Sequence, residues 1–308
     1  MHEHVAHAMY YFSIHLLYAS AVGVAAWGLT TIPAASATTK YWIWVVTAFN
    51  FAVPVGAMVD RFWGTHFTWA KPIGAIGGPV WEMTQGRIAV VLALVWIAGA
   101  LAMAIRLVLR LRSEFRQGLV SGESRNMTSR VTRLGIPVAF DSRHSAPAVD
   151  GVIRQRILLP VGIDQILNQQ ELDAVLLHEM THARRRDNLI RLLFEVSLCA
   201  LWFHPLIWFA GTRMALYREL SCDESVIRHA HGKALVRALV KLATPREATF
   251  LRATASSHLS HRLARLAGQA QDTHRAPSLL LIALFTVAVA VGVYGTIAHT
   301  ACCFVLKH

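Results

Sequence analysis

The sequence predicts a mainly α-helical, polytopic membrane protein that carries a small sheet-containing domain on one side of the bilayer. Of the 308 residues, 55% are hydrophobic and 16% are charged, a balance typical of membrane proteins. Four apolar segments are long enough to cross a hydrocarbon core of about 30 Å. Between the third and fourth of them lies a long charged stretch in which strand-like and helix-like patterns alternate.

The four predicted transmembrane helices cover residues 8–30, 41–59, 88–109 and 278–297. The first is too long for a signal peptide, and no basic segment precedes it, so we expect it to remain in the protein. Trp and Tyr gather near the ends of the spans, as in an interfacial aromatic belt. This set is Tyr10, Tyr11, Tyr41, Trp42, Trp44, Trp63, Trp69 and Trp81.

Charge predicts the orientation. Residues 105–276 hold 25 of the 30 Lys and Arg residues, whereas the loop 60–87 holds three. Because cytoplasmic loops are rich in Lys and Arg, the sequence predicts a three-span unit (1–109), a cytoplasmic domain (110–277) and a fourth span with a short tail (278–308). The N-terminus and the tail then lie outside a bacterial inner (cytoplasmic) membrane.

The net charge of +12 has two interpretations. A basic surface suits nucleic acid, but it also suits the anionic inner leaflet of a membrane. Because the basic residues follow the spans, we expect the lipid bilayer as partner and no direct contact with nucleic acid.

Strands are expected early in the cytoplasmic domain. Residues 131–140 and 152–160 alternate in strand fashion, and 141–151 reads as a turn-rich connection. The run Ile157, Leu158 and Leu159 is interpreted as an edge strand that pairs with an extended substrate, although an inner strand would show the same pattern.

A helix is expected over residues 168–187. Asn168 and Glu171 have the spacing of a capping box, which marks the start of the helix. Three consecutive arginines close the segment, where the helix dipole favours cations. An apolar stripe recurs at helical spacing between these ends: Leu172, Val175, Leu176, Met180 and Ala183.

This helix carries the pattern H-E-x-x-H at residues 178–182. Positions i and i+4 lie on one face of a helix, so His178 and His182 can reach a single Zn²⁺ at about 2.0–2.1 Å. Glu179 then stands beside an open coordination position, where a carboxylate can serve as general base. Two ordinary helix histidines are the alternative interpretation.

A catalytic zinc needs a third protein ligand, and Glu219 is the best candidate. Asp223 lies four residues further on and shares its helix face, so it is expected to accept a hydrogen bond from one of the histidines. Asp187 is expected to act in the same way. Glu224 is the nearest rival of Glu219, and Cys222 is a softer one.

Residues 189–210 are apolar but are interrupted by charged residues and by His204-Pro205. A full crossing would place His182 and Glu219 on opposite sides of the bilayer. We therefore expect a membrane-associated hairpin or an interfacial helix that returns to the same face.

The four cysteines predict no disulfide framework. Cys199 and Cys222 lie in the cytoplasmic segment, where thiols stay reduced. Cys302 and Cys303 are adjacent in the tail, and their state is left open.

The combination of H-E-x-x-H, the segment H-P-L-I-W at 204–208 and E-L-S-C-D-E at 219–224 resembles the membrane zinc metallopeptidases of the BlaR/MecR type, the β-lactam-sensing antirepressor receptors. The resemblance covers about residues 8–300. It implies a gluzincin-like α+β domain, with His178, His182 and Glu219 as zinc ligands and Glu179 as the catalytic carboxylate. It also implies a penicillin-binding sensor domain after the last span, which this chain is expected to lack.

The predicted activity is that of a zinc-dependent endopeptidase that signals by cleaving a cytoplasmic transcriptional repressor, itself, or both. A homodimer is an open possibility. Two alternatives remain. One is a peptidase for membrane-protein quality control or for prenylated proteins, and the other is a non-catalytic receptor or scaffold with a structural metal.

Overall fold

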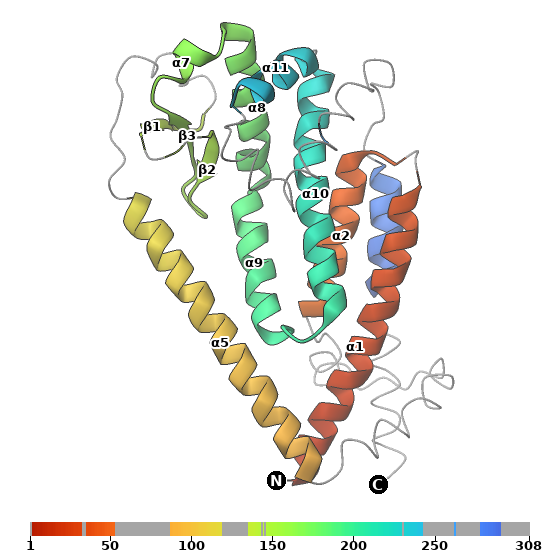
Figure 1. Ribbon diagram of the computed structural model, residues 1–308. Helices are drawn as coiled ribbons and strands as arrows, with labels where there is room; N and C mark the ends of the chain where they lie inside the picture. The colour runs from red at the N-terminus through yellow and green to blue at the C-terminus, as the bar shows by residue number, and fades with distance from the viewer. Residues whose placement is uncertain are drawn as a thin grey trace.

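A computed structural model shows a bundle of long helices with a small sheet at one end (Figure 1). The structure describes residues 2–32, 35–52, 87–118, 135–142, 144, 146–229, 231–242, 262 and 278–290. Its helices are α1 (His2–Thr31), α2 (Ala37–Ala52), α5 (Arg87–Gly118), α7 (Ile163–Ile166), α8 (Gln169–Arg185), α9 (Asp187–Ala200), α10 (Pro205–Arg228) and α11 (Gly232–Leu242). The mainly helical fold with a small sheet, predicted from sequence, is confirmed.

The sheet has three strands, β1 (Val138–Asp141), β2 (Ala148–Asp150) and β3 (Arg156–Pro160), in the order β1-β3-β2. β1 runs parallel to β3, with Ala139 opposite Leu158. β2 runs antiparallel to β3, with Val149 opposite Ile157. The expected connection 141–151 thus contains a strand of its own.

The prediction that Ile157, Leu158 and Leu159 form an edge strand is wrong. They lie in β3, the central strand, whose two edges are already paired. All three side chains are buried, Ile157 and Leu159 in the core under α8, which explains why the run is continuously apolar. A substrate strand cannot pair with them, because no edge of β3 is left open.

α9 and α10 form a helical hairpin. α9 continues the direction of α8, the chain turns back at residues 201–204, and Pro205 at the first turn of α10 begins the return. The C-terminal half of α10 therefore reaches the level of α8 (Figure 1). α10 also packs along α2, through Trp44 and Ala210 among other buried residues.

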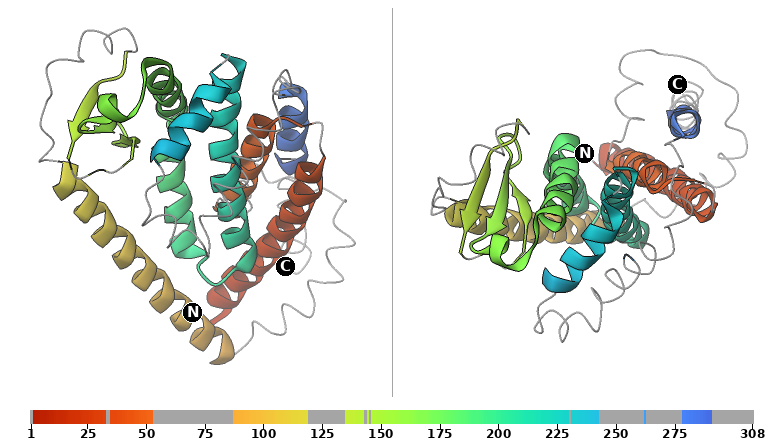
Figure 2. Two further views of the ribbon diagram at one scale, coloured as in Figure 1. Left: turned by 45° about the horizontal axis from the view of Figure 1, so that its top comes forward. Right: turned by 90° about the horizontal axis from the view of Figure 1, so that it is seen from above.

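α5 leans away from the other helices and meets the hairpin near its tip (Figure 2). The indole nitrogen of Trp96 donates to the carbonyl of Ala200 at 2.6 Å. Further up, the Arg110 guanidinium forms an ion pair with Glu195 of α9. Close approach is possible at Gly99, where any side chain would collide with the Trp202 ring.

Among the described helices, one is long and apolar enough to cross a bilayer, Val90–Ser113 within α5. α1 covers the first predicted span. The second is described as far as Ala52, and the fourth appears in part as a shorter apolar helix, Leu279–Ala290. Four transmembrane helices therefore stay a prediction.

The prediction of an interfacial aromatic belt is wrong for two of its residues. Tyr41 and Trp44 are fully buried between helices and do not face an interface. Trp63, Trp69 and Trp81, as well as Cys302 and Cys303, lie outside the described residues.

Candidate metal centre

The start of α8 is fixed as the sequence predicts. Asn168 caps the helix by accepting from the Glu171 amide at 3.0 Å, and the Glu171 carboxylate accepts from the Asn168 amide at 3.0 Å. This reciprocal capping box is confirmed. Leu172, Val175 and Met180 are buried against the sheet and α11, which turns His178 and His182 towards α10.

The end of α8 is marked by Arg186, which takes the left-handed conformation at φ 57°. For a residue with a side chain this conformation is unfavourable. It breaks the helical path so that Asp187, the first residue of α9, points back at α8. The Asp187 carboxylate lies 2.7 Å from Nδ1 of His182.

Three atoms converge between α8 and α10. Nε2 of His178 lies 3.2 Å from Nε2 of His182. Oε2 of Glu219 lies 3.6 Å from the first nitrogen and 3.8 Å from the second. Ligands at about 2.0–2.1 Å from a tetrahedral zinc are roughly 3.4 Å apart. The triangle therefore has the size that a shared zinc ion requires.

A carboxylate lies beside the opposite nitrogen of each imidazole, within hydrogen-bond geometry at His182 but not at His178. Nδ1 of His178 lies 3.2 Å from Asp223 and Nδ1 of His182 lies 2.7 Å from Asp187. Such carboxylate–histidine pairs are typical around metal ions, because they fix the ring orientation and leave Nε2 as the ligand. The structure brings Asp187 and Asp223 to the histidines, and their role around a metal ion stays a prediction.

The site concentrates negative charge in a buried place. Burial lowers the pKa of His178, but Asp223 and Glu219 outweigh it and raise that pKa to about 9. Burial raises the pKa of Glu219, but His178 and the neighbouring cations hold it well below its usual range. The carboxylates therefore favour a cation between the ligand atoms, either a proton on His178 or a metal ion.

Glu179 follows His178 on α8 and is half-buried. Within the part of the chain that the structure describes, its carboxylate makes no hydrogen bond or ion pair. A carboxylate without such partners beside a metal site can accept a proton.

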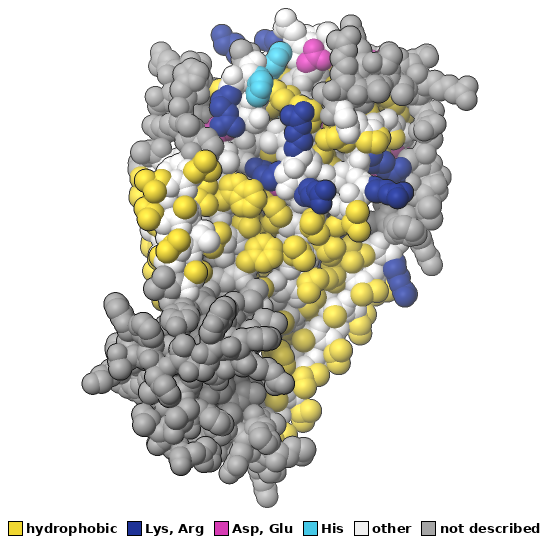
Figure 3. All heavy atoms as spheres, turned by 180° about the vertical axis from the view of Figure 1, so that it is seen from behind, with side chains coloured by type: hydrophobic (Ala, Val, Ile, Leu, Met, Phe, Trp, Pro, Cys, Tyr) yellow, Lys and Arg dark blue, Asp and Glu magenta, His cyan; other side chains and the backbone are white. Residues whose placement is uncertain are grey.

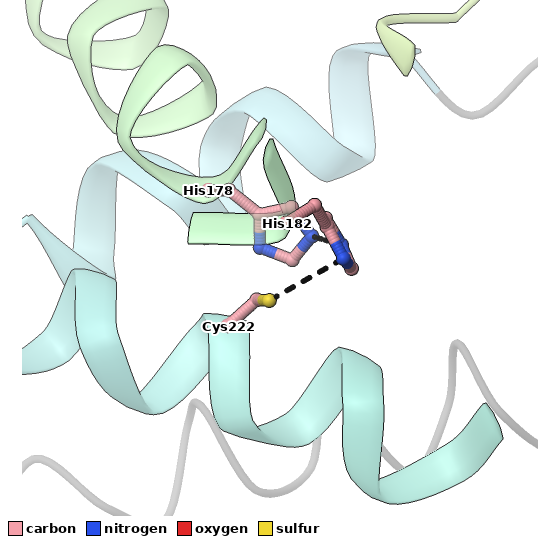
Figure 4. A group of neighbouring side chains, drawn as sticks. All are labelled: His178, His182 and Cys222. Atoms are coloured by element: carbon pink, nitrogen blue, oxygen red, sulfur yellow. Dashed lines mark hydrogen bonds between the residues drawn. The ribbon is translucent and has the colours of Figure 1, made fainter. Parts of the chain in front are cut away.

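Neither Glu224 nor Cys222 is positioned as favourably as Glu219 to be the third metal ligand. Glu224 accepts hydrogen bonds from the amide and the hydroxyl of Thr38 at 3.2 Å, so its carboxylate binds the first turn of α2. Cys222 lies beside the two histidines (Figure 4). However, its sulfur approaches His182 at Nδ1, 3.6 Å away, and accepts from Arg185 at 3.3 Å. Burial also raises the thiol pKa well above its usual value, which favours the protonated form that does not bind metal.

Sequence reasoning missed three residues that hold the site. The Tyr41 hydroxyl of α2 donates to Asp187 at 3.0 Å. Arg185 binds both oxygens of Asp187, at 2.7 and 2.6 Å. Arg262 binds both oxygens of Asp223, at 2.8 and 2.7 Å. No local pattern marks Tyr41 or Arg262, because each meets its partner from a remote segment.

Comparison with known families assigns the chain to one of them. A model of the BlaR1 peptidase M56 family matches residues 12–266. The chain belongs to this peptidase family. The resemblance stated from the sequence is confirmed.

Curated relatives are similar over a shorter stretch. The methicillin resistance mecR1 protein of Staphylococcus aureus is 29% identical over 100 residues, which is 31% of this chain and 17% of that protein. The regulatory protein BlaR1 of Bacillus licheniformis is 36% identical over 83 residues, 27% of this chain and 14% of that protein. The matched part of the chain thus spans less than a fifth of the length of these relatives.

Proposed function

We propose that the protein is a zinc-dependent endopeptidase at the cytoplasmic face of a bacterial inner membrane. The triangle formed by His178, His182 and Glu219 is the observation that carries this proposal, because its sides of 3.2–3.8 Å suit one zinc ion. The two histidines and one carboxylate form a donor set used by catalytic zinc, which takes a water as its fourth ligand. Membership of a peptidase family supports the same activity.

The chain's own residues supply the proton transfers. A zinc ion, when bound, polarises the scissile carbonyl and makes a water more acidic. Glu179 accepts the proton of that water and later delivers it to the leaving amine. Asp187 keeps the His182 imidazole in the orientation that presents Nε2, and the Asp223 carboxylate lies 3.2 Å from Nδ1 of His178.

The membrane placement rests on charge and on which helix ends lie together. The amide of Ser278 donates to Thr39 at 3.0 Å, so the last apolar helix starts beside the start of α2. Thr38 contacts Glu224, which places both starts at the level of the metal centre. Lys and Arg side chains gather above a broad apolar surface in the view from behind (Figure 3). This arrangement fits a cytoplasmic metal centre under the positive-inside rule.

The substrate is a protein, and we propose a cytoplasmic transcriptional repressor, the enzyme itself, or both. The relatives named as regulatory and resistance proteins support a signalling role. A quality-control or prenyl-protein peptidase would use the same ligands, but it would degrade membrane proteins without one preferred target. A structural metal in a scaffold would need a fourth protein ligand.

Replacement of the catalytic carboxylate tests the proposal. Glu179→Ala is expected to keep zinc and to lose roughly 10²–10⁴-fold in peptide hydrolysis, because general-base catalysis contributes that much. Zinc content of the purified protein and a proteomic search for a truncated cytoplasmic protein would measure both effects.

Glu224→Ala is the matched control, since Glu224 contacts Thr38 and not the histidines. It is expected to cleave normally. Normal turnover by Glu179→Ala would contradict the proposed mechanism, and a zinc ion with four protein ligands would favour the scaffold.

A further inference from the structure

Three residues at the start of α2 contact three different parts of the molecule. The amide and the hydroxyl of Thr38 donate to Glu224 of α10 at 3.2 Å. The hydroxyl of Thr39 accepts from the amide of Ser278, just before the last apolar helix (Leu279–Ala290), at 3.0 Å. Tyr41 reaches the junction of α8 and α9. This short stretch of α2 therefore joins the last apolar helix to the elements that carry the metal centre.

Tyr41 completes the hydrogen bonding of the Asp187 carboxylate. Oδ1 of Asp187 accepts from the Tyr41 hydroxyl at 3.0 Å and from Nε of Arg185 at 2.7 Å. Oδ2 accepts from Nη2 of Arg185 at 2.6 Å and lies 2.7 Å from Nδ1 of His182. Because an ionised carboxylate offers about four acceptor positions, these contacts fill it. The carboxylate cannot turn without losing one of them, so Tyr41 helps to fix the oxygen that faces His182.

The Tyr41 side chain is tightly packed. It is 1% exposed, and the Arg185 guanidinium lies over its ring at 4.1 Å. The ring belongs to the same buried cluster as Phe285 and Val289 of the last apolar helix. Protein interiors are close-packed, so a shift of one element displaces its neighbours and is not absorbed by empty space. A displacement of the last apolar helix is therefore transmitted to the Tyr41 hydroxyl.

Thr39 gives the last apolar helix a second, polar connection to α2. Thr39 is fully buried, and its hydroxyl lies 2.9 Å from the hydroxyl of Ser36. Its amide donates to the same Ser36 oxygen at 3.1 Å, which makes Ser36 the N-cap of α2. The amide of Ser278 thus binds to the capped first turn that positions Tyr41.

We propose that Tyr41 is a positioning residue of the metal centre, and that it makes the zinc affinity of the site depend on how the last apolar helix packs against α2. Tyr41 acts through Asp187, which lies between its hydroxyl and His182. The proposal rests on the proposed zinc site, and it adds to that site a helix from the three-span unit predicted over residues 1–109.

Zinc affinity of the full chain in detergent, measured by competition with a chromogenic chelator, tests the proposal. Tyr41→Phe keeps the ring and removes the hydroxyl, and it is expected to bind zinc about fivefold more weakly, the usual effect of one lost hydrogen bond. Thr39→Val removes the acceptor of Ser278, and a smaller loss of about threefold is expected for a residue that acts from a distance. The double variant is expected to lose no more than Tyr41→Phe, because both changes act through one contact.

Thr47→Val is the matched control. Thr47 is also fully buried on α2, but its hydroxyl donates within the helix, to the carbonyl of Ile43 at 2.8 Å. It is expected to bind zinc as the wild type does. A loss in Thr47→Val equal to that in Thr39→Val would overturn the proposal, because general loosening of α2 would then explain both.

Unchanged zinc affinity in either Tyr41→Phe or Thr39→Val would also overturn it, and additive losses in the double variant would exclude the route through Tyr41. Glu219→Gln separates this proposal from the proposed function. If that variant kept its zinc, the assigned ligand set would fail, whereas the effects of Tyr41 and Thr39 act at His182 and would still be measured.

Discussion

At the scale of single residues, the site depends on what binds the outer nitrogens of the two histidines. Asp187 is buried, and it is held by Arg185 and Tyr41 while it contacts His182. Burial raises the pKa of Asp187, but the contacts with His182 and Arg185 lower it further than burial raises it. It therefore stays ionised and fixes one tautomer of His182.

Asp187→Ala is expected to lower zinc affinity 10–100-fold, which is the usual effect of losing such a partner. Competition with a chromogenic chelator would measure it. Asp173→Ala is the control, because Asp173 lies exposed on α8 and binds Gln169 at 2.8 Å. Equal zinc affinity of Asp187→Ala and wild type would show that the histidine orientation does not need this carboxylate.

At the scale of elements, the hairpin brings Glu219 to the histidines because α9 and α10 approach closely. Gly211 permits the approach, since a Cβ there would lie 2.6 Å from the Phe194 ring. The hairpin is also tied to α5 by Trp96 and Arg110. Small residues at helix crossings are typical of membrane bundles.

Gly211→Val is expected to destabilise the protein by about 1–3 kcal/mol, because it forces the Phe194 ring and the two helices apart. The shift in thermal unfolding temperature in detergent would measure this. Gly28→Val is the control, since nothing described lies within 4 Å of a Cβ at that position. A similar loss of stability in both variants would attribute the effect to the substitution of a helical glycine alone.

At the scale of the whole molecule, the proposed orientation depends on which end of the helix bundle carries the candidate metal centre. The sheet, α8 and the end of α10 lie at one end of the bundle, and the hairpin tip lies towards the other (Figures 1 and 2). The charge distribution predicts that the first of these ends is cytoplasmic.

Cysteine labelling of intact cells would test the orientation. Asp164→Cys, exposed between the sheet and α8, is expected to react with an impermeant maleimide only after the cells are opened. Thr65→Cys, in the loop predicted to lie outside, is expected to react in intact cells. Both variants need Cys302 and Cys303 replaced by serine. Labelling of Asp164→Cys in intact cells would reverse the proposed topology.

The sequence by itself determined the local parts of the site. The capping box of α8, its apolar stripe and the two histidines on one face follow from interactions within four residues, which the periodicity of a helix displays directly. The sequence also made Glu219, 37 residues beyond His182, the best candidate for the third zinc ligand. The segment E-L-S-C-D-E at 219–224 restricts that choice to a few acidic residues.

Only the tertiary structure decided the non-local parts. β3 became the central strand because β1 and β2 pair with it from both sides, and strand order is not encoded in the alternation of one strand. Tyr41 and Arg262 joined the site from segments 146 and 39 residues away from their partners. Such contacts depend on how helices pack together, and no spacing within either segment specifies them.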